Sequence, residues 1–244
     1  MSAEDNVEPR KVRRLVLLTG AFESQLLMPH LAKIADGLHV THVETRAALD
    51  AAMAKDLAGT RLLSFCTAVI VPGALLDRLP GPAYNIHPGS PNYPGRHPES
   101  WGAYDAVTRF GATLHEMVPR VDEGAIVDVE WTDIPAGSGQ MAVGLQAFRA
   151  ALRLFSRWAL RLSEDSAPLP RSGAVWSGRK TTHQQLVDMC RITAEIDAAE
   201  FERRRRAFAE QPGSRMSLML HGREFAFVAP AQPMDGTAGK QTEG

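Results

Sequence analysis

The sequence has little cysteine, no long apolar run and no leader-like start. Its 244 residues include two cysteines, Cys66 and Cys190, which are far apart and lack the spacing of metal ligands. This disfavours a disulfide scaffold and favours a reducing cytoplasm. The apolar runs stop well short of the roughly 18 residues that a membrane helix needs. The polar start MSAEDNVEPRKVRR lacks the apolar core of a signal peptide. We therefore expect a cytoplasmic protein with no membrane partner.

An excess of charge of one sign is also absent. The chain has 27 basic and 28 acidic residues, a net charge of −1. No overall field is available to hold nucleic acid, so we predict no nucleic-acid partner. The motifs G-x-G-x-x-G, G-x-x-x-x-G-K-[ST] and G-x-S-x-G do not occur. No motif therefore supports a function in dinucleotide binding, nucleoside-triphosphate binding or serine hydrolysis.

Apolar strands and helical patterns alternate along the first two thirds of the chain. The runs RRLVLLTG and RLLSFCTAVIV are almost continuously apolar, as in strands buried on both faces. The sequence predicts strands at 13–20, 39–45, 61–71, 83–87, 110–118 and 124–134, and helices at 24–36, 46–57, 72–79, 99–107 and 140–164. This alternation indicates βαβ units and an α/β fold with a doubly wound, mainly parallel, Rossmann-like sheet.

The last third has a different texture. A proline-rich link, SAPLPRSG, precedes helical patterns at 182–191 and 197–209 and a hairpin over 215–228 that turns at His221-Gly222. We predict a main domain over 12–165 and a small appendage over 166–229. The polar, Gly- and Pro-containing ends, 1–11 and 230–244, are predicted to be disordered.

One strand end carries two polar side chains that are suited to chemistry. In the stretch YNIHPG, Asn85 and His87 share one face of the strand, and Tyr84 and Ile86 share the other. Ligands of such sheets bind beyond the carboxyl ends of the strands. An amide donor and an imidazole could together hold an oxyanion and move a proton. The alternative is an ordinary capped turn. Asp122 is a candidate to orient the imidazole, although spacing alone does not place it.

Four motifs in order resemble the folate-dependent formyltransferase family. They are Asn-Ile-His-Pro (85–88), Tyr-Pro-Gly-Arg-His-Pro-Glu-Ser-Trp (93–101), Gly-Ala-Thr-Leu-His (111–115) and Asp-Glu-Gly (122–124). The resemblance is strong over about 60–135 and extends in pattern over 13–60. Residues 176–180 and the stretch EFERRRRAF more weakly resemble members that act on amino sugars.

The resemblance implies a set of site residues. Asn85, His87 and Asp122 would be catalytic, and 10-formyltetrahydrofolate would be the co-substrate whose formyl group an amine attacks. Asn85 and a protonated His87 would stabilise the oxyanion, with Asp122 holding that charge. The folate would lie against backbone at the positions that match the family's pocket, which are Thr67, Ala68, Ile70, Met117 and Val121.

Departures from the family bear on the acceptor. The loop after His-Pro is one residue shorter than usual, Pro94 replaces an arginine, and the first strand exits into TGAFES rather than a multi-glycine loop. These features disfavour a glycinamide ribonucleotide, and the lack of a following basic barrel disfavours initiator tRNA. A small-molecule amine on a sugar or nucleotide-sugar is the first hypothesis. Amines on coenzyme A or amino acids, hydrolysis of 10-formyltetrahydrofolate to formate, and a non-catalytic folate-binding or assembly module remain alternatives. A homodimer is left open.

The remaining signals each allow a structural interpretation. The run Arg203–Arg206 is typical of a solvated helix face with i,i+3 and i,i+4 pairs; alternatively, Arg204 and Arg205 grip a substrate phosphate. His39 and His42 lie on opposite faces of a strand, which argues against a shared metal, and we predict no metal site. His115 is interpreted as structural or as a residue that supports the site from outside the catalytic set. Trp101 and Trp176 are interpreted as packing residues, with sugar stacking as the alternative.

Overall fold

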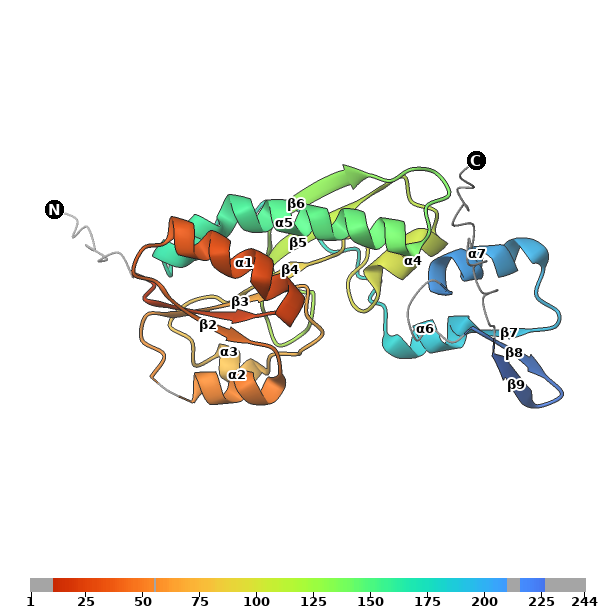
Figure 1. Ribbon diagram of the computed structural model, residues 1–244, viewed down its shortest axis with the longest axis horizontal. Helices are drawn as coiled ribbons and strands as arrows, with labels where there is room; N and C mark the ends of the chain where they lie inside the picture. The colour runs from red at the N-terminus through yellow and green to blue at the C-terminus, as the bar shows by residue number, and fades with distance from the viewer. Residues whose placement is uncertain (1–10, 55, 210–215, 227–244) are drawn as a thin grey trace, which may run out of the picture.

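The computed structural model describes residues 11–54, 56–209 and 216–226. The strands of its central sheet are β1 (Arg14–Leu18), β2 (His39–Val43), β3 (Thr60–Phe65), β4 (Tyr84–His87), β5 (Arg109–Glu116) and β6 (Ile126–Asp133). They lie in the order β2-β1-β3-β4-β5-β6 (Figure 1). Strands β1 to β4 are parallel, whereas β5 is antiparallel to β4 and β6 is antiparallel to β5.

Helices cover both faces of this sheet. On one face lie α1 (Ala21–Ile34) and α5 (Gln140–Glu164), and on the other lie α2 (Arg46–Met53) and α3 (Gly73–Leu76) (Figure 1). The predicted α/β fold with a doubly wound, mainly parallel sheet is therefore confirmed. The predicted bounds of α5 are also those of the structure, because its apolar face keeps a helical period over the whole length.

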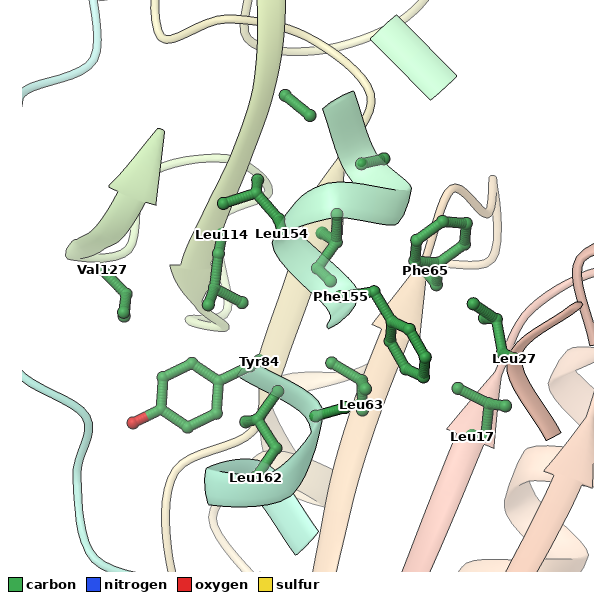
Figure 2. Close-up of a cluster of buried hydrophobic side chains, with 14 of the residues drawn as sticks. Leu17, Leu27, Leu63, Phe65, Tyr84, Leu114, Val127, Leu154, Phe155 and Leu162 are labelled. Atoms are coloured by element: carbon green, nitrogen blue, oxygen red, sulfur yellow. The ribbon is translucent and has the colours of Figure 1, made fainter. Parts of the chain in front are cut away.

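The side chains of a buried strand enter two apolar cores, one on each face of the sheet. Along β1, Leu15 and Leu17 enter the core under α1 and α5, and Val16 and Leu18 enter the core under α2 and α3, as the alternation of side chains in a strand requires. Figure 2 shows the first core, whose labelled members are Leu17, Leu27, Leu63, Phe65, Tyr84, Leu114, Val127, Leu154, Phe155 and Leu162. Burial on both faces explains why the strand runs in the sequence are continuously apolar.

A smaller unit stands beside α4 (Pro98–Tyr104). Its elements are α6 (His183–Cys190), β7 (Arg191–Thr193), α7 (Ala198–Phe208), β8 (Ser217–Leu220) and β9 (Arg223–Ala226). The hairpin β8–β9 was predicted, and its turn residues His221 and Gly222 both have positive φ. Strand β7, which pairs parallel with β8, was not predicted. A third apolar cluster, which includes Trp101 and Phe208, joins α4 to α6 and α7, so the unit packs on the sheet domain (Figure 1). The domain limits at 165 and 166 stay predictions.

The two predicted disordered ends, 1–11 and 230–244, lie outside the described residues except for Lys11. That residue forms an isolated β-bridge with Asp165. Within the described ranges, no helix combines the length and the hydropathy that a membrane span requires.

Candidate active site

A cavity of about 470 Å³ opens at the carboxyl ends of β3 and β4. Asn85 and His87 both line it, while Tyr84 and Ile86 point into the apolar core, as the two-residue period of β4 predicts. Strand β3 ends earlier than predicted because Cys66 turns the chain with φ 47°. The residues after Cys66 therefore form a wall of the cavity instead of continuing the strand.

Asp122 completes a constellation with two histidines. It lies in the turn between β5 and β6 at φ 51° and is 3% exposed. The Gly95 N–H donates to Asp122 Oδ2 over 2.8 Å. His87 Nδ1 is 3.6 Å from Asp122 Oδ2, and His115 Nε2 is 3.3 Å from Asp122 Oδ1. The carboxylate that the sequence could not place is thus next to His87.

The charge state of Asp122 follows from these contacts. Burial is the largest influence and opposes ionisation. The positive charge of His87, the hydrogen bond and charge of His115 and the Gly95 amide together outweigh it. They hold the pKa of the Asp122 carboxyl well below its usual range. The site therefore contains a buried carboxylate that is ionised at neutral pH and faces two imidazoles.

Backbone carbonyls orient both imidazoles. His87 Nε2 lies 3.0 Å from the Tyr93 carbonyl oxygen, and His115 Nδ1 lies 2.9 Å from the Glu116 carbonyl oxygen. A carbonyl only accepts, so each of these nitrogens carries a proton. The nitrogens that face Asp122 are then His87 Nδ1 and His115 Nε2. His87 Nδ1 therefore faces the carboxylate at ion-pair distance, 3.6 Å, while Nε2 keeps its bond to the backbone.

His115 has a larger part in the site than the sequence indicated. It pairs with Asn85 across β4 and β5, and its Nε2 lies 3.1 Å from Asn85 Nδ2. The same Nε2 lies 3.3 Å from Asp122 Oδ1, so His115 stands between the Asn85 amide and the carboxylate. The orientation of the Asn85 side chain therefore depends on His115. Its place in the Gly-x-Thr-x-His motif was the signal available in the sequence.

A glycine and strained backbone surround the cavity. A Cβ atom on Gly89 would stand 2.4 Å from His87 Nε2, so only glycine lets this loop pass the imidazole. Cys66, His97 and Asp122 all have positive φ and all line the cavity. Positive φ in non-glycine residues is uncommon and gathers at functional sites. Burial, with a smaller contribution from Glu23, raises the pKa of the Cys66 thiol well above its usual range.

The predicted folate-contacting residues also line the cavity. These are Thr67, Ala68, Ile70, Met117 and Val121. Ile70 and Val121 are 56% and 38% exposed, so this end of the cavity presents apolar side chains to solvent. Such an apolar wall suits a flat ring system.

Arg204 and Arg205 are not among the cavity-lining residues. On α7, Arg204 Nε lies 2.6 Å from Glu200, and Arg205 Nε lies 2.8 Å from Glu202. These are the i,i+4 and i,i+3 pairs of the solvated-face interpretation. Their grip on a substrate phosphate stays a prediction.

A basic part of the cavity lining was missed by the sequence reasoning. Arg96, His97, Lys180 and His183 form it; we call these four residues the basic rim. His97 Nε2 is 3.3 Å from His183 Nδ1. Burial is the main reason that the pKa of His97 is lowered, with His183 and Arg96 acting in the same direction and Glu99 against it. No local pattern could join residues that are 86 positions apart.

Metal ligation is not a feature of the described ranges, where no group of three or more His, Cys, Asp or Glu side chains is arranged to hold an ion. His42 Nε2 lies 3.0 Å from the Thr19 carbonyl oxygen, which agrees with its interpretation as a structural histidine.

Comparison with known proteins supplies the family. The model of the formyl transferase family matches residues 34–145, a range that contains Asn85, His87, His115 and Asp122. Residues 34–145 thus resemble the formyl transferase family, and the predicted family resemblance is confirmed.

Solved structures share the fold of this formyl transferase domain and of the unit beside it. A 4-N formyltransferase from Francisella tularensis is 16% identical with a TM-score of 0.68, covering 89% of this chain and 97% of its own. A sugar N-formyltransferase from a Shewanella species is 13% identical with the same TM-score and the same coverage. An N-formyltransferase from Helicobacter canadensis, solved in complex with folinic acid and dTDP-3-aminofucose, is 14% identical with a TM-score of 0.62. That alignment covers 84% of this chain and 86% of its own.

Proposed function

We propose that the protein is an N-formyltransferase that moves a formyl group from 10-formyltetrahydrofolate to a primary amine on a sugar or nucleotide-linked sugar. The observation that carries the proposal is the constellation of Asn85, His87 and a buried, ionised Asp122 on one cavity wall. It offers an amide donor, an imidazole and, 3.6 Å from that imidazole, a counter-charge.

The roles of these residues follow from formyl transfer. The amine nitrogen bonds to the formyl carbon, and the carbonyl electron pair moves onto oxygen. Asn85 donates to that oxyanion, and the positive charge of His87 stabilises it. Asp122 stabilises the positive charge of His87. Together these two residues carry the proton that the amine loses, and they deliver it to the departing N10 nitrogen of the folate. The bond from carbon to N10 then breaks and the formamide is released. One preorganised donor of this kind accounts for about 10²–10³ in rate.

The cavity lining contains apolar and basic residues, which support different parts of the two substrates. The apolar end at Ile70 and Val121 suits the pterin, in keeping with the folinic acid that the Helicobacter protein binds. The basic rim suits an acceptor that carries an anionic group. Arg96 is exposed and makes no ion pair within the part of the chain that the structure describes, so its charge is available to such a ligand.

A thermal melt with a stable 10-formyl-folate analogue tests the donor. Saturation at about one hundred times Kd adds about 2.7 kcal/mol, or a rise in Tm of about 5–10 °C for a chain of this size. Product analysis with amino sugars and nucleotide-linked amino sugars then tests the transfer. The variant His87→Asn should lose turnover, and the exposed His39→Asn serves as its control.

The products separate the alternatives. If formate were released at the same rate with and without amine, the protein would be a hydrolase and not a transferase. Folate binding without turnover on any amine or water would favour a binding module. A melt that does not respond to the analogue would contradict folate binding altogether.

A further inference from the structure

Trp176 packs against both imidazoles of the site. The centroid of its ring system is 5.9 Å from that of His87 and 5.0 Å from that of His115, at interplanar angles of 72° and 87°. Residues 171–180 are all described, and Trp176 is the one among them that is not exposed. An otherwise exposed segment therefore turns one aromatic side chain onto the two histidines.

The indole N–H reaches the turn that holds the carboxylate. Trp176 Nε1 donates to the Gly124 carbonyl oxygen over 2.8 Å, two residues after Asp122. The same side chain thus contacts both imidazoles with its ring and the Asp122 turn with its donor. Asp122 has φ 51°, a conformation that must be held by its surroundings.

The backbone on either side anchors the indole. The N–H of Ser172 donates to the Ile126 carbonyl oxygen at the start of β6, over 2.9 Å. The N–H of Ser177 donates to the Pro91 carbonyl oxygen over 3.0 Å. The loop that receives Ser177 also supplies the carbonyl that accepts from His87. Residues 172–177, here called the strap, therefore span both backbone segments on which the site depends.

Substrate stacking does not explain this position. Trp176 is not among the cavity-lining residues, and its ring packs against the two imidazoles instead. Trp101, the other tryptophan that the sequence singled out, packs against Phe208 in the third apolar cluster. Among the described residues, no ring contact joins Trp101 to His87 or His115.

We propose that Trp176 is a positioning residue that holds His87, His115 and the Asp122 turn in register for formyl transfer, an inference that rests on the function proposed above. Misplacing a reacting group by about 1 Å can lower the rate about 10²-fold. Replacement of the indole by a flexible aliphatic side chain removes the ring from both imidazoles and the donor from Gly124. Such a change acts on kcat and leaves the apolar end of the cavity intact.

The test compares Trp176→Leu, Trp176→Phe and the matched control Trp131→Leu. Trp131 is a half-buried tryptophan on β6 that packs on Arg109, away from the site. We expect Trp176→Leu to lower kcat by about 10–100-fold while Kd for the folate analogue stays within about threefold. Trp176→Phe keeps a ring against the imidazoles and should recover most of the loss. Trp131→Leu should change Tm but not kcat.

Each outcome decides the role. Equal kcat in Trp176→Leu and wild type, or a loss that Trp176→Phe does not relieve and Trp131→Leu reproduces, would overturn it. If the wild type itself transfers no formyl group, the proposed function fails and the position of the rings is read by NMR instead. The ring signals of His87 and His115 should then shift and broaden in Trp176→Leu but not in Trp131→Leu. Unchanged signals would refute positioning independently of activity.

Discussion

Replacement of Asp122 by asparagine removes one charge from the centre of the site with little change in shape. The amide oxygen of Asp122→Asn can still accept from Gly95, whose N–H now donates over 2.8 Å. The two imidazoles, at 3.6 and 3.3 Å, lose their anionic partner. Only the electrostatic part of the constellation is removed, so the variant isolates the contribution of that charge.

The magnitude follows from burial. Asp122 is 3% exposed, so its contacts are hardly screened by solvent. Hydrogen bonds to charged groups contribute about 1.5–3 kcal/mol, which for a chain of this size corresponds to a fall in Tm of about 3–12 °C. Proton transfer by a positioned group contributes about 10²–10⁴ in rate. We therefore expect kcat to fall by about that factor, while Kd for the folate analogue changes only a few fold.

The stability effect depends on pH with a defined sign. The pKa of Asp122 is depressed in the folded state, below the value of about 3.9 for an unfolded aspartate. Its ionised form therefore stabilises the fold above about pH 4, and this contribution is lost as pH falls from there through the folded-state pKa. The gap in unfolding free energy between wild type and Asp122→Asn should be largest above about pH 5 and should shrink below about pH 4.

Urea melts at several pH values and steady-state kinetics check both expectations. The control is Asp133→Asn, which neutralises an exposed carboxylate at the end of β6 and should alter neither kcat nor the pH dependence of stability. If Asp122→Asn kept wild-type kcat, Asp122 would be removed from the mechanism. A stability gap that stayed constant down to pH 3 would refute the assigned charge state.

Three further variants test other predicted positions. Gly89→Ala places a Cβ atom 2.4 Å from His87 Nε2, so we expect kcat to fall at least about tenfold with an unchanged circular dichroism spectrum. Arg96→Ala should raise KM for an anionic acceptor about tenfold and leave KM for an uncharged amino sugar unchanged, as initial rates with the two acceptors would show. Ala at both Arg204 and Arg205 should raise the acceptor KM if these side chains grip phosphate, and an unchanged KM would leave them with their ion pairs alone.

The sequence was informative wherever a short period or a fixed motif carries the geometry. Continuous apolar runs predict strands covered on both faces, and β1 and β3 are buried in that way. The two-residue period of β4 predicts that Asn85 and His87 share the cavity face. Strand β7 was missed because its three residues are too few to show a period, and because its partner β8 lies more than twenty residues later.

The contacts that complete the site have no local signature. Asp122 reaches His87 because a turn residue adopts positive φ, a conformation that spacing does not reveal. In the basic rim, His97 contacts His183, which lies 86 positions later. The segment that leads to His183 was marked by its composition only as a proline-rich link. Such pairs depend on how the chain returns to the sheet after α5, which is a property of the whole fold.

This return path changes the meaning of the C-terminal unit. The sequence predicted a small appendage packed on the main domain, with Arg204 and Arg205 as its candidate substrate contacts. In the structure, however, Lys180 and His183 line the cavity and Trp176 packs against His87 and His115. Thr181 forms an isolated β-bridge with Gly95, whose N–H donates to Asp122. The strap and the start of α6 therefore lie at the candidate site, and on the proposed function we expect acceptor preference and catalytic rate to depend on residues outside the family-matched range 34–145.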